Sequence, residues 1–374
     1  MAAESPSSKT FTTCLSPSRS LRRVAEAVLP QLAVLKWDDG DVTNSSRPTI
    51  YDVAARAGVS KSLVSLVLRE PGTVSERRRR AVLEAIDELG YRPSSAAASL
   101  AGTRTRTIGM VVEDFANLWF VDLLQGLREV LKPEGLQVLM GDRQMTMSPG
   151  RDAIDAFVSM RVEGLVLALD PPDVLTGLHG IPAVVAGERG PHPDGVAKVA
   201  NDDRSGARLA TRHLIELGHT RIAHVTGEGG AAQVRREAYE ATMTEAGLEP
   251  VVVGHGNPTN DEAATVATRE LLAVRRDVTA IFAANDAMGL GCMGALREVG
   301  LSVPDDVSIV GYDNSLIAQA AYLDMTTVDD RSLDVGRETA RVLLDRIGGA
   351  TTEASTLLLT PSLIVRSTTR PAAR

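Results

Sequence analysis

The sequence predicts an all-α helix-turn-helix unit, followed by an α/β body of two lobes built from doubly wound parallel sheets. Two amphipathic segments between Thr49 and Leu68, joined at Gly58, indicate the first unit. From Thr107 onward, short apolar runs alternate with helical patterns, which is typical of buried parallel strands and their crossover helices. At 374 residues the chain is long enough for two or three folding units.

The composition is that of an ordinary globular protein whose charge is unevenly distributed. Apolar residues make up 44% and charged residues 24% of the chain, and the net charge is −8. Arg47 to Arg106 holds eleven Arg or Lys against six Asp or Glu, a net charge of +5, which leaves −13 for the remainder. A basic module on an acidic body indicates that this module alone meets nucleic-acid phosphate.

The chain carries no expected mark of export, membrane insertion or redox chemistry. Its two cysteines, Cys14 and Cys292, lie far apart in sequence, and no disulfide is expected. No apolar run approaches the roughly 18 residues of a membrane span. Glu26 and Pro30 interrupt the only stretch that resembles a signal peptide. We therefore expect a cytoplasmic protein without a membrane partner.

Composition shifts divide the chain into four parts. Residues 1–46 are rich in Ser, Pro and Thr and are expected to be a disordered extension. Residues 47–92 form the helical headpiece, residues 93–106 a short helix and linker, and residues 107–374 the α/β core. Within the core, one lobe is expected to span about 107–202 and 331–350, and the other about 203–330 and 351–370.

The first two helices have clear sequence signals. Thr49 and Asp52 have the spacing of a capping box, Gly58 supplies a left-handed stop, and Ser60 caps the second helix. The face of the second helix opposite its apolar stripe carries polar and basic residues and one leucine: Lys61, Ser62, Ser65, Leu66 and Arg69. Such a face suits the DNA major groove, where base edges offer donors and acceptors. The alternative is a helical hairpin whose polar face is merely solvated.

Two further helices follow in the basic module. Val74 and Ser75 resemble a staple and cap for a third helix that ends at Gly90 and carries Arg77–Arg80 in its first turns. Ser94–Leu100 has helical composition but is shorter than the roughly 12–15 residues that an isolated helix needs in water. We expect it to become helical only when it is packed against a partner, as a switch.

The core is expected to contain the following buried strands: Ile108–Val112, Leu136–Met140, Gly164–Ala168, Ala183–Ala186, Ile222–Val225, Val251–Val253, Ala280–Ala283 and Val307–Val310. Helical patterns lie between them, for example Phe120–Leu131, Ser205–Leu217 and Ala287–Val299. Ligands of such sheets bind beyond the carboxyl ends of the strands. Polar residues follow several of these ends, namely Glu113-Asp114, Asn285-Asp286 and Asp313-Asn314, with Arg235 on a nearby helix. Each could instead only cap a helix, but their recurrence favours a binding cleft.

These residues together resemble the lactose-repressor/galactose-repressor (LacI/GalR) family of bacterial transcription regulators. The resemblance covers roughly Thr49 to Thr368 and rests on the following motifs in order: TIYDVAARAGVS, the run Val59–Ser65, LGYRPSSAAASLAG, NDDRSGARLATRHLIELGHTRIAHVTG, AIFAANDAMGLG, VPDDVSIVGYDNS and MTTVDD. It implies a helix-turn-helix headpiece and a hinge helix that orders on DNA. It also implies a periplasmic-binding-protein-like core that dimerises and binds a small effector, most often a sugar, and a repressor that reads a palindromic operator.

The resemblance also implies roles for individual residues. Lys61, Ser62 and Leu66 would face bases, with Ser65 on the same surface. Thr49, Tyr51 and Ser75 would meet phosphates, and Leu100 would be a minor-groove wedge. Five residues match effector-contacting positions: Asp114, Phe115, Arg235, Asn285 and Asp313.

The chain departs from the family pattern at several positions. Leu66 cannot hydrogen-bond a base, so it would read an apolar feature such as a thymine methyl group. Ala186-Gly187 stands where sugar-binding relatives often carry Asp, with Glu188-Arg189 next, so the effector need not be a simple neutral sugar. No heptad tail follows the last strand, which favours a homodimer.

Two other classes of protein fit the residues less well. A periplasmic solute-binding protein would explain the α/β body but not the headpiece, and it would need an export signal. An enzyme would need catalytic residues, but we find no GxGxxG turn, phosphate-binding loop, metal cluster or Ser/His/Asp arrangement. We expect no catalytic activity, no metal and no cofactor.

Overall fold

The computed structural model describes residues 48–69, 71–92, 105–142, 153–169, 178, 180–188, 190, 195–350 and 355–373. The chain divides into two compact units, residues 1–93 and 94–374, which are described separately below. The expected disordered extension, the Ser94–Leu100 helix and Leu100 itself lie outside the described residues.

The described part of the first unit is a helical headpiece. It contains α2 (Ile50–Ala57), α3 (Lys61–Arg69), a 3-10 turn (Pro71–Thr73) and α4 (Glu76–Leu89). Its core consists of small apolar side chains from all three α-helices: Val53, Ala54, Val64, Val67, Val82 and Ala85. These are the positions that the helical periodicity of the sequence places on the inner faces.

Local capping chemistry sets the ends of these helices. Thr49 Oγ1 accepts from the backbone N–H of Asp52, whose carboxylate accepts from the Thr49 N–H at 2.7 Å, so the predicted capping box is confirmed. Gly58 ends α2 with φ 63°, a left-handed conformation that costs glycine little. Ser60 Oγ accepts from the Leu63 N–H at 3.3 Å. Ser75 precedes α4, but its side chain makes no capping bond, contrary to expectation.

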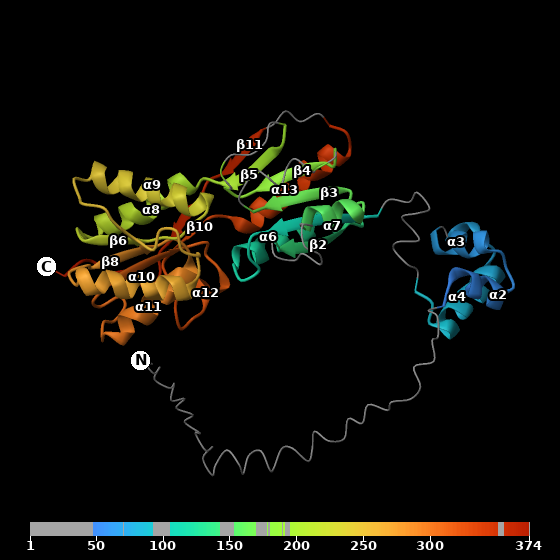
Figure 1. The fold of residues 1–374 in the computed structure, drawn as a ribbon, viewed down its shortest axis with the longest axis horizontal. Coiled ribbons are helices and arrows are strands. Elements are labelled where there is room, and N and C mark those ends of the chain that lie inside the picture. The colour runs from blue at the N-terminus through green and yellow to red at the C-terminus, as the bar shows by residue number, and fades with distance from the viewer. Residues whose placement is uncertain are drawn as a thin grey trace, which may run out of the picture. The chain divides into compact units, whose positions relative to one another are not determined.

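The second unit contains two six-stranded sheets (Figure 1). The first sheet has the order β11-β5-β4-β3-β1-β2 and the second β12-β10-β9-β8-β6-β7. The strands of the first are β1 (Thr107–Val112), β2 (Gln137–Asp142), β3 (Gly164–Ala168), β4 (Ala183–Ala186), β5 (Ala197–Asn201) and β11 (Thr356–Leu359). Those of the second are β6 (Ile222–Val225), β7 (Val251–Val253), β8 (Ala280–Ala283), β9 (Ser308–Tyr312), β10 (Thr327–Asp329) and β12 (Ser362–Ile364). All described pairings are parallel except that of β10 with β12, which confirms the predicted fold class.

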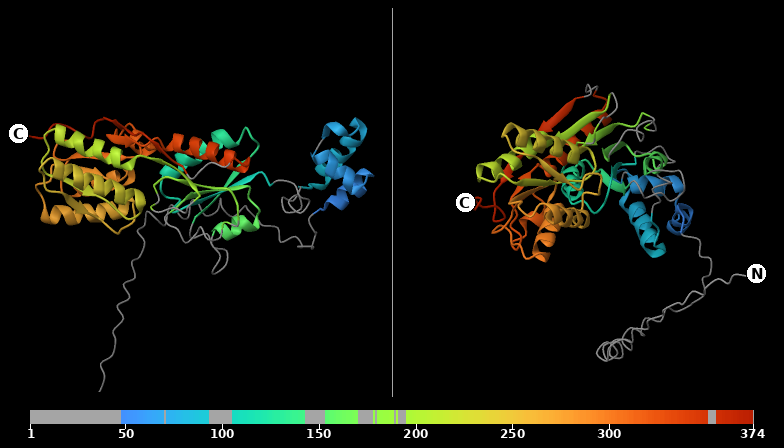
Figure 2. Two further views of the ribbon diagram at one scale, coloured as in Figure 1. Left: turned by 90° about the horizontal axis from the view of Figure 1, so that it is seen from above. Right: turned by 60° about the vertical axis from the view of Figure 1, so that its left-hand side comes forward.

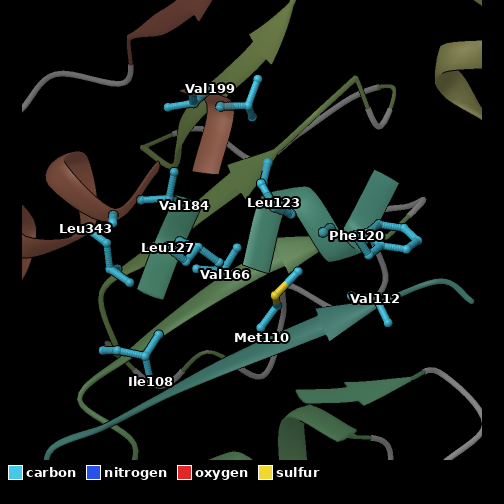
Figure 3. Close-up of a cluster of buried hydrophobic side chains, with 14 of the residues drawn as sticks. Ile108, Met110, Val112, Phe120, Leu123, Leu127, Val166, Val184, Val199 and Leu343 are labelled. Carbon is cyan, nitrogen blue, oxygen red and sulfur yellow. The ribbon is translucent and has the colours of Figure 1, made fainter. Parts of the chain in front are cut away.

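Helices cover both faces of each sheet, as two further views show (Figure 2). On the first sheet, α6 (Trp119–Leu131) and α13 (Ser332–Ile347) cover one face and α7 (Ala153–Ser159) the other. On the second sheet, α8 (Asp203–Glu216) and α9 (Gly230–Glu245) cover one face, and α10 (Asp261–Val274) and α11 (Asp286–Glu298) the other. The short helix α12 (Leu316–Gln319) follows β9. Figure 3 shows the apolar cluster of the first lobe, in which Met110, Leu123 and Leu343 join β1, α6 and α13.

The helices α6 and α13 pack against each other through two glycines. A Cβ atom at Gly126 would lie 2.0 Å from the Leu333 carbonyl oxygen, and one at Gly336 would lie 2.3 Å from the Leu123 carbonyl oxygen. Both distances are shorter than any real contact, so the two backbones approach this closely only because neither position has a side chain.

The chain passes between the lobes three times, and one of these crossings corrects the expected boundary. It leaves the first sheet after β5, returns after β10 through α13, and leaves again between β11 and β12. Thr356–Leu359 pairs with β5, so this part of the range 351–370 belongs to the first lobe rather than the second. This pairing adds β11 to the first sheet as a parallel edge strand. Local periodicity in the sequence cannot specify which strand β11 pairs with. No described helix is long and apolar enough to cross a membrane.

Candidate functional sites: the exposed face of α3 and the cleft of the core

At the exposed start of α3, Lys61 contacts Tyr51 of α2. Lys61 Nζ lies 5.0 Å above the centre of the Tyr51 ring and donates to its hydroxyl at 3.3 Å. Tyr51 is 64% exposed, so the pair stands at the surface. A cation over an aromatic face contributes about 0.5–1 kcal/mol at such a site and restricts the lysine rotamers.

The other candidate DNA-reading residues lie on or beside the same short helices. Ser62 is exposed on α3, while Ser65 and Leu66 are half-buried one turn further along. Thr49 and Ser75 are exposed at the amino ends of α2 and α4. A helix amino end favours anions because its first N–H groups lack intrahelical partners. The headpiece thus presents donors and one apolar side chain from α3, with phosphate-compatible helix ends beside them.

The core contains a cleft at the carboxyl ends of strands from both sheets. Its described lining residues are Asn117, Trp119, Gly187, Glu188, Asn201, Asp203, Glu228, Gly229, Gly230, Ala231, Ala232, Arg235, Thr259, Ala284, Asn285 and Asp313. A second cavity shares Asn117, Thr259, Asn285 and Asp313 with it and adds Asp114 and Asp261. Parallel strands end at one edge of each sheet, so the loops after β1, β4 and β5 meet those after β6, β8 and β9.

Arg235 is the electrostatic centre of this cleft. Its side chain is 8% exposed, and its Nε donates to Asp203 Oδ1 at 2.6 Å. Its Nη1 donates to the Ala284 carbonyl at 2.6 Å and to Asp313 Oδ1 at 3.4 Å, and its guanidinium lies 3.6 Å from the centre of the Tyr312 ring. Burial opposes the charged form, but Asp203 and then Asp313 outweigh burial and raise the pKa of Arg235.

The carboxylates around Arg235 are incompletely neutralised. Burial raises the pKa of Asp313 well above its ordinary value, even though Arg235 opposes the shift. Asp203 is the nearer carboxylate, at 2.6 Å from the guanidinium, whereas Asp313 lies at 3.4 Å. Burial likewise raises the pKa of Asp330, behind the cleft, to about 7. The single Arg235 guanidinium therefore interacts electrostatically with several buried carboxyl groups.

The sequence-predicted ligand residues come together only in part. Arg235, Asn285 and Asp313 line the main cleft, and Asp114 lines the adjoining cavity. Asn285 also caps α11, with its Oδ1 accepting from the Met288 N–H at 2.8 Å, so the capping role is present at a position that lines the cleft. Phe115 is 45% exposed and lines neither cavity, so the structure does not bring it to the other four.

Sequence reasoning missed several lining residues, among them Trp119, Asn201 and Asp203. Asn201 ends β5 and Asp203 begins α8, and the β5 sequence AKVAN is too polar at Lys198 to be predicted as a buried strand. Lys198 is nonetheless mostly buried, because Glu188 pairs with it at 3.0 Å. Trp119 had a usable signal: it is one of two tryptophans and follows a strand end. Among the described residues, no group of His, Cys, Asp and Glu side chains could hold a metal ion.

Two family models of known proteins match separate parts of the chain. Residues 49–94 match the family model described as "Bacterial regulatory proteins, lacI family", and residues 211–369 match "Periplasmic binding protein-like domain". The chain is 38% identical over 340 residues to the HTH-type transcriptional regulator CelR of Thermobifida fusca, covering 86% of this chain and 98% of that protein. It is 35% identical to the HTH-type transcriptional repressor PurR of Vibrio campbellii, with the same two coverages.

Solved structures give the same result. A CelR–cellobiose complex matches with a TM-score of 0.63 and 35% identity, over 86% of this chain and all of that one. A lac repressor dimer bound to operator and the anti-inducer ONPF matches with a TM-score of 0.71 and 27% identity, over 87% of this chain and all of that one.

A helix-turn-helix headpiece joined to a periplasmic-binding-protein-like core defines a transcription regulator with its own ligand-binding domain. The chain belongs to the LacI family of bacterial regulators, which confirms the resemblance seen in the sequence. Its relatives carry names of regulators and repressors rather than of enzymes.

Proposed function

We propose that the protein is a homodimeric repressor that binds a palindromic operator and changes its affinity for that operator when a carbohydrate occupies the core cleft. The observation that carries this proposal is the cleft around Arg235, which combines charged and amide hydrogen-bonding groups with the indole of Trp119. Sugars need such a set, because their hydroxyl groups both donate and accept while their C–H faces pack on aromatic rings.

The headpiece supports the DNA half of the proposal. Lys61, Ser62 and Leu66 would contact base edges, with Ser65 beside them, while Thr49, Tyr51 and Ser75 would contact phosphates. The solved lac repressor relative is a dimer bound to operator, which supports the same assembly for this chain. Two headpieces related by a twofold axis would read two half-sites, so the operator would be a palindrome.

The linker supplies the proposed connection between ligand and DNA. Residues 93–106 join the headpiece to the core, and Ser94–Leu100 is too short for a stable isolated helix. Two such segments would become helical against each other and the DNA, with Leu100 as a wedge in the minor groove. A change of angle between the lobes would separate them, and a modest ligand bias would suffice to shift such a marginal equilibrium.

A carbohydrate effector is supported by the cleft chemistry and by one relative. The CelR structure is a complex with cellobiose, and this chain is 35% identical to it. Cellobiose and related gluco-oligosaccharides are therefore the first probes. A true ligand at a hundredfold excess over its Kd should stabilise the protein by about 2.7 kcal/mol, visible as a rise in Tm.

The decisive experiment measures operator binding with and without each stabilising sugar. A palindromic site selected from random DNA should be retained by the protein and released, or held more tightly, when the sugar is added. Arg235→Lys keeps one charge but loses the fork that reaches Asp203 and Ala284, so it should abolish the sugar response while leaving operator affinity intact. Arg212→Lys, an exposed arginine on α8, is the matched control. If no sugar alters either Tm or operator affinity, the carbohydrate assignment is wrong.

A further inference from the structure

The described lining of the cleft is strongly acidic. Four carboxyl groups line the main cavity, those of Glu188, Asp203, Glu228 and Asp313. The adjoining cavity shares Asp313 and adds Asp114 and Asp261. Against these six carboxyl groups, Arg235 is the single cation among the described residues that line either cavity.

The cations near the cleft are already engaged. Arg235 donates to two carboxylates and to the Ala284 carbonyl. Lys198 lies behind Glu188, with its side chain 12% exposed and its Nζ 3.0 Å from Glu188 Oε2. Both cations therefore already have a carboxylate partner within the described part of the cleft.

Two buried polar atoms at the cleft have no partner among the described residues. They are Asp203 Oδ2 and Asn201 Nδ2, on side chains that are 3% and 2% exposed. The first requires a donor and the second an acceptor. A buried polar atom left unpaired is destabilising, so both atoms favour a ligand that supplies a donor beside an acceptor. A hydroxyl group next to an amine or another hydroxyl meets that requirement.

We propose that the cleft selects a hydroxyl-rich ligand that carries a protonated amine, the chemistry of an amino sugar, over its neutral and anionic counterparts. This inference rests on the proposed function, because it refines the class of carbohydrate that the same cleft binds. The unpaired oxygen of Asp203 accepts the N⁺–H group, Asn201 donates to a neighbouring hydroxyl, and the excess carboxylates stabilise the charge.

The electrostatic state of the site supports this choice. Burial raises the pKa of Asp313 and Arg235 opposes the shift, while the acidic neighbours Asp330, Asp286 and Asp203 add to it by repelling the ionised carboxylate. A ligand cation would relieve that repulsion, a neutral sugar would leave it unchanged, and a carboxylate or phosphate would add to it.

The test uses two series of three sugars, each with a neutral member, a member with amine in place of hydroxyl, and a member with a carboxylate. Glucose, glucosamine and glucuronic acid form one series, and cellobiose, its fully deacetylated glucosamine disaccharide analogue and cellobiouronic acid form the other. Calorimetric titration of the full chain near pH 7 should give the tightest binding for the amine in at least one series. Charged hydrogen bonds exceed neutral ones by about 1 kcal/mol or more, so the amine should bind about tenfold more tightly than the neutral sugar.

Charge-neutralising variants identify the source of the preference. Glu228→Gln removes one cleft carboxylate on an exposed loop, and Asp203→Asn removes the carboxylate with the unpaired oxygen. Both should lower the ratio of amine to neutral-sugar affinity severalfold. Glu270→Gln makes the same charge change on the exposed surface of α10, outside both cavities, and should leave the ratio unchanged.

The possible results separate the two proposals. If the neutral sugar binds as tightly as the amine, or if neither cleft variant changes the ratio, charge selection is refuted while the carbohydrate function stands. If none of the six sugars binds, both proposals fall.

Discussion

Trp119 donates its indole N–H to Asp330 Oδ2 at 2.7 Å. Trp119 begins α6 in the first lobe and lines the cleft, whereas Asp330 lies on the crossing between β10 of the second lobe and α13 of the first. The backbone N–H of Ser332 donates to the other oxygen of the same carboxyl group at 3.0 Å. One side chain therefore touches both the ligand cleft and the segment about which the lobes would move.

Trp119→Phe should remove the hydrogen bond that joins the cleft to the crossing segment at Asp330. The phenyl ring keeps an aromatic face in the cleft, but Asp330 Oδ2 loses its donor in a fully buried environment. The loss should cost about 1–3 kcal/mol of core stability and lower the Tm accordingly. We also expect ligand-induced changes in tryptophan fluorescence in the wild type and none in this variant.

The chain's other tryptophan, Trp37, lies outside the described residues and provides the control. Trp37→Phe should retain both the stability and the ligand-induced fluorescence change. An undiminished Tm in Trp119→Phe would show that the bond to Asp330 contributes nothing to the fold.

The Asp330 carboxyl should stabilise the core less as pH rises from about 4 to about 7, whereas buried His224, whose pKa burial lowers to about 3, acts in the opposite direction. Burial raises the pKa of Asp330 from 3.8 to about 7, with Arg235 opposing the shift and Asp203 adding to it. Between the unfolded and folded pKa values the native state binds more protons than the unfolded state, so the free energy of unfolding decreases with rising pH. Burial raises the pKa of Asp286 to about 6, which acts in the same direction.

Thermal unfolding of the protein across this pH range measures the effect. Asp330→Asn cannot titrate, so it lacks this contribution, and its Tm should be lower at acidic pH because Trp119 and Ser332 compete for one oxygen. The Tm of the wild type minus that of Asp330→Asn should fall from pH 4 to pH 7. A difference that rises over this range would contradict this account, because it would show that the Asp330 carboxylate is stabilised as an anion.

Lys61→Ala should weaken binding to the selected operator more than binding to random DNA. A base contact carries about 1–3 kcal/mol of discrimination, whereas a phosphate contact affects all sequences alike and lowers the salt dependence by about one unit. Arg78→Ala, at an exposed arginine on α4, serves as the contrasting cation. Equal losses on both DNAs for Lys61→Ala would make Lys61 a phosphate contact.

Tyr51→Phe tests the arrangement that holds Lys61. The variant removes the hydroxyl that accepts from Lys61 Nζ but keeps the ring beneath it. Operator affinity should fall less than in Lys61→Ala, since most of the cation–π attraction remains. A loss equal to that of Lys61→Ala would show that the hydroxyl itself contacts DNA.

Gly126→Ala should destabilise the core strongly. The added methyl group would lie 2.0 Å from the Leu333 carbonyl oxygen, so α6 and α13 would have to move apart. Overpacking of this kind costs about 1–3 kcal/mol or more. Gly294→Ala on α11 is the matched control, because its added methyl group meets no atom within 4 Å and should leave the Tm unchanged or raise it. Equal Tm values for the two variants would refute the close contact.

Local sequence was sufficient where the controlling interactions are local. The capping box of Thr49 and Asp52 spans three residues, and Gly58 ends α2 through its own backbone conformation. Eight strands of the core are apolar runs that need no knowledge of their partners to be predicted, whereas β5, β10, β11 and β12 were not predicted. Arg235, Asn285 and Asp313 were found because a residue after a buried parallel strand, or on the helix that follows, must lie near the binding edge.

Tertiary structure alone decided which residues complete the cleft and to which lobe a segment belongs after the chain crosses between the lobes. Thr356–Leu359 joins the first sheet through pairing with β5, more than 150 positions away in the sequence. Asn201 and Asp203 line the cleft because β5 is buried, with Lys198 neutralised by Glu188. Phe115 lies outside the cleft although it directly follows Asp114. Sequence determined the elements because caps and periodicity act over a few residues. The site depends on where strand ends from two sheets converge, and only long-range packing fixes that.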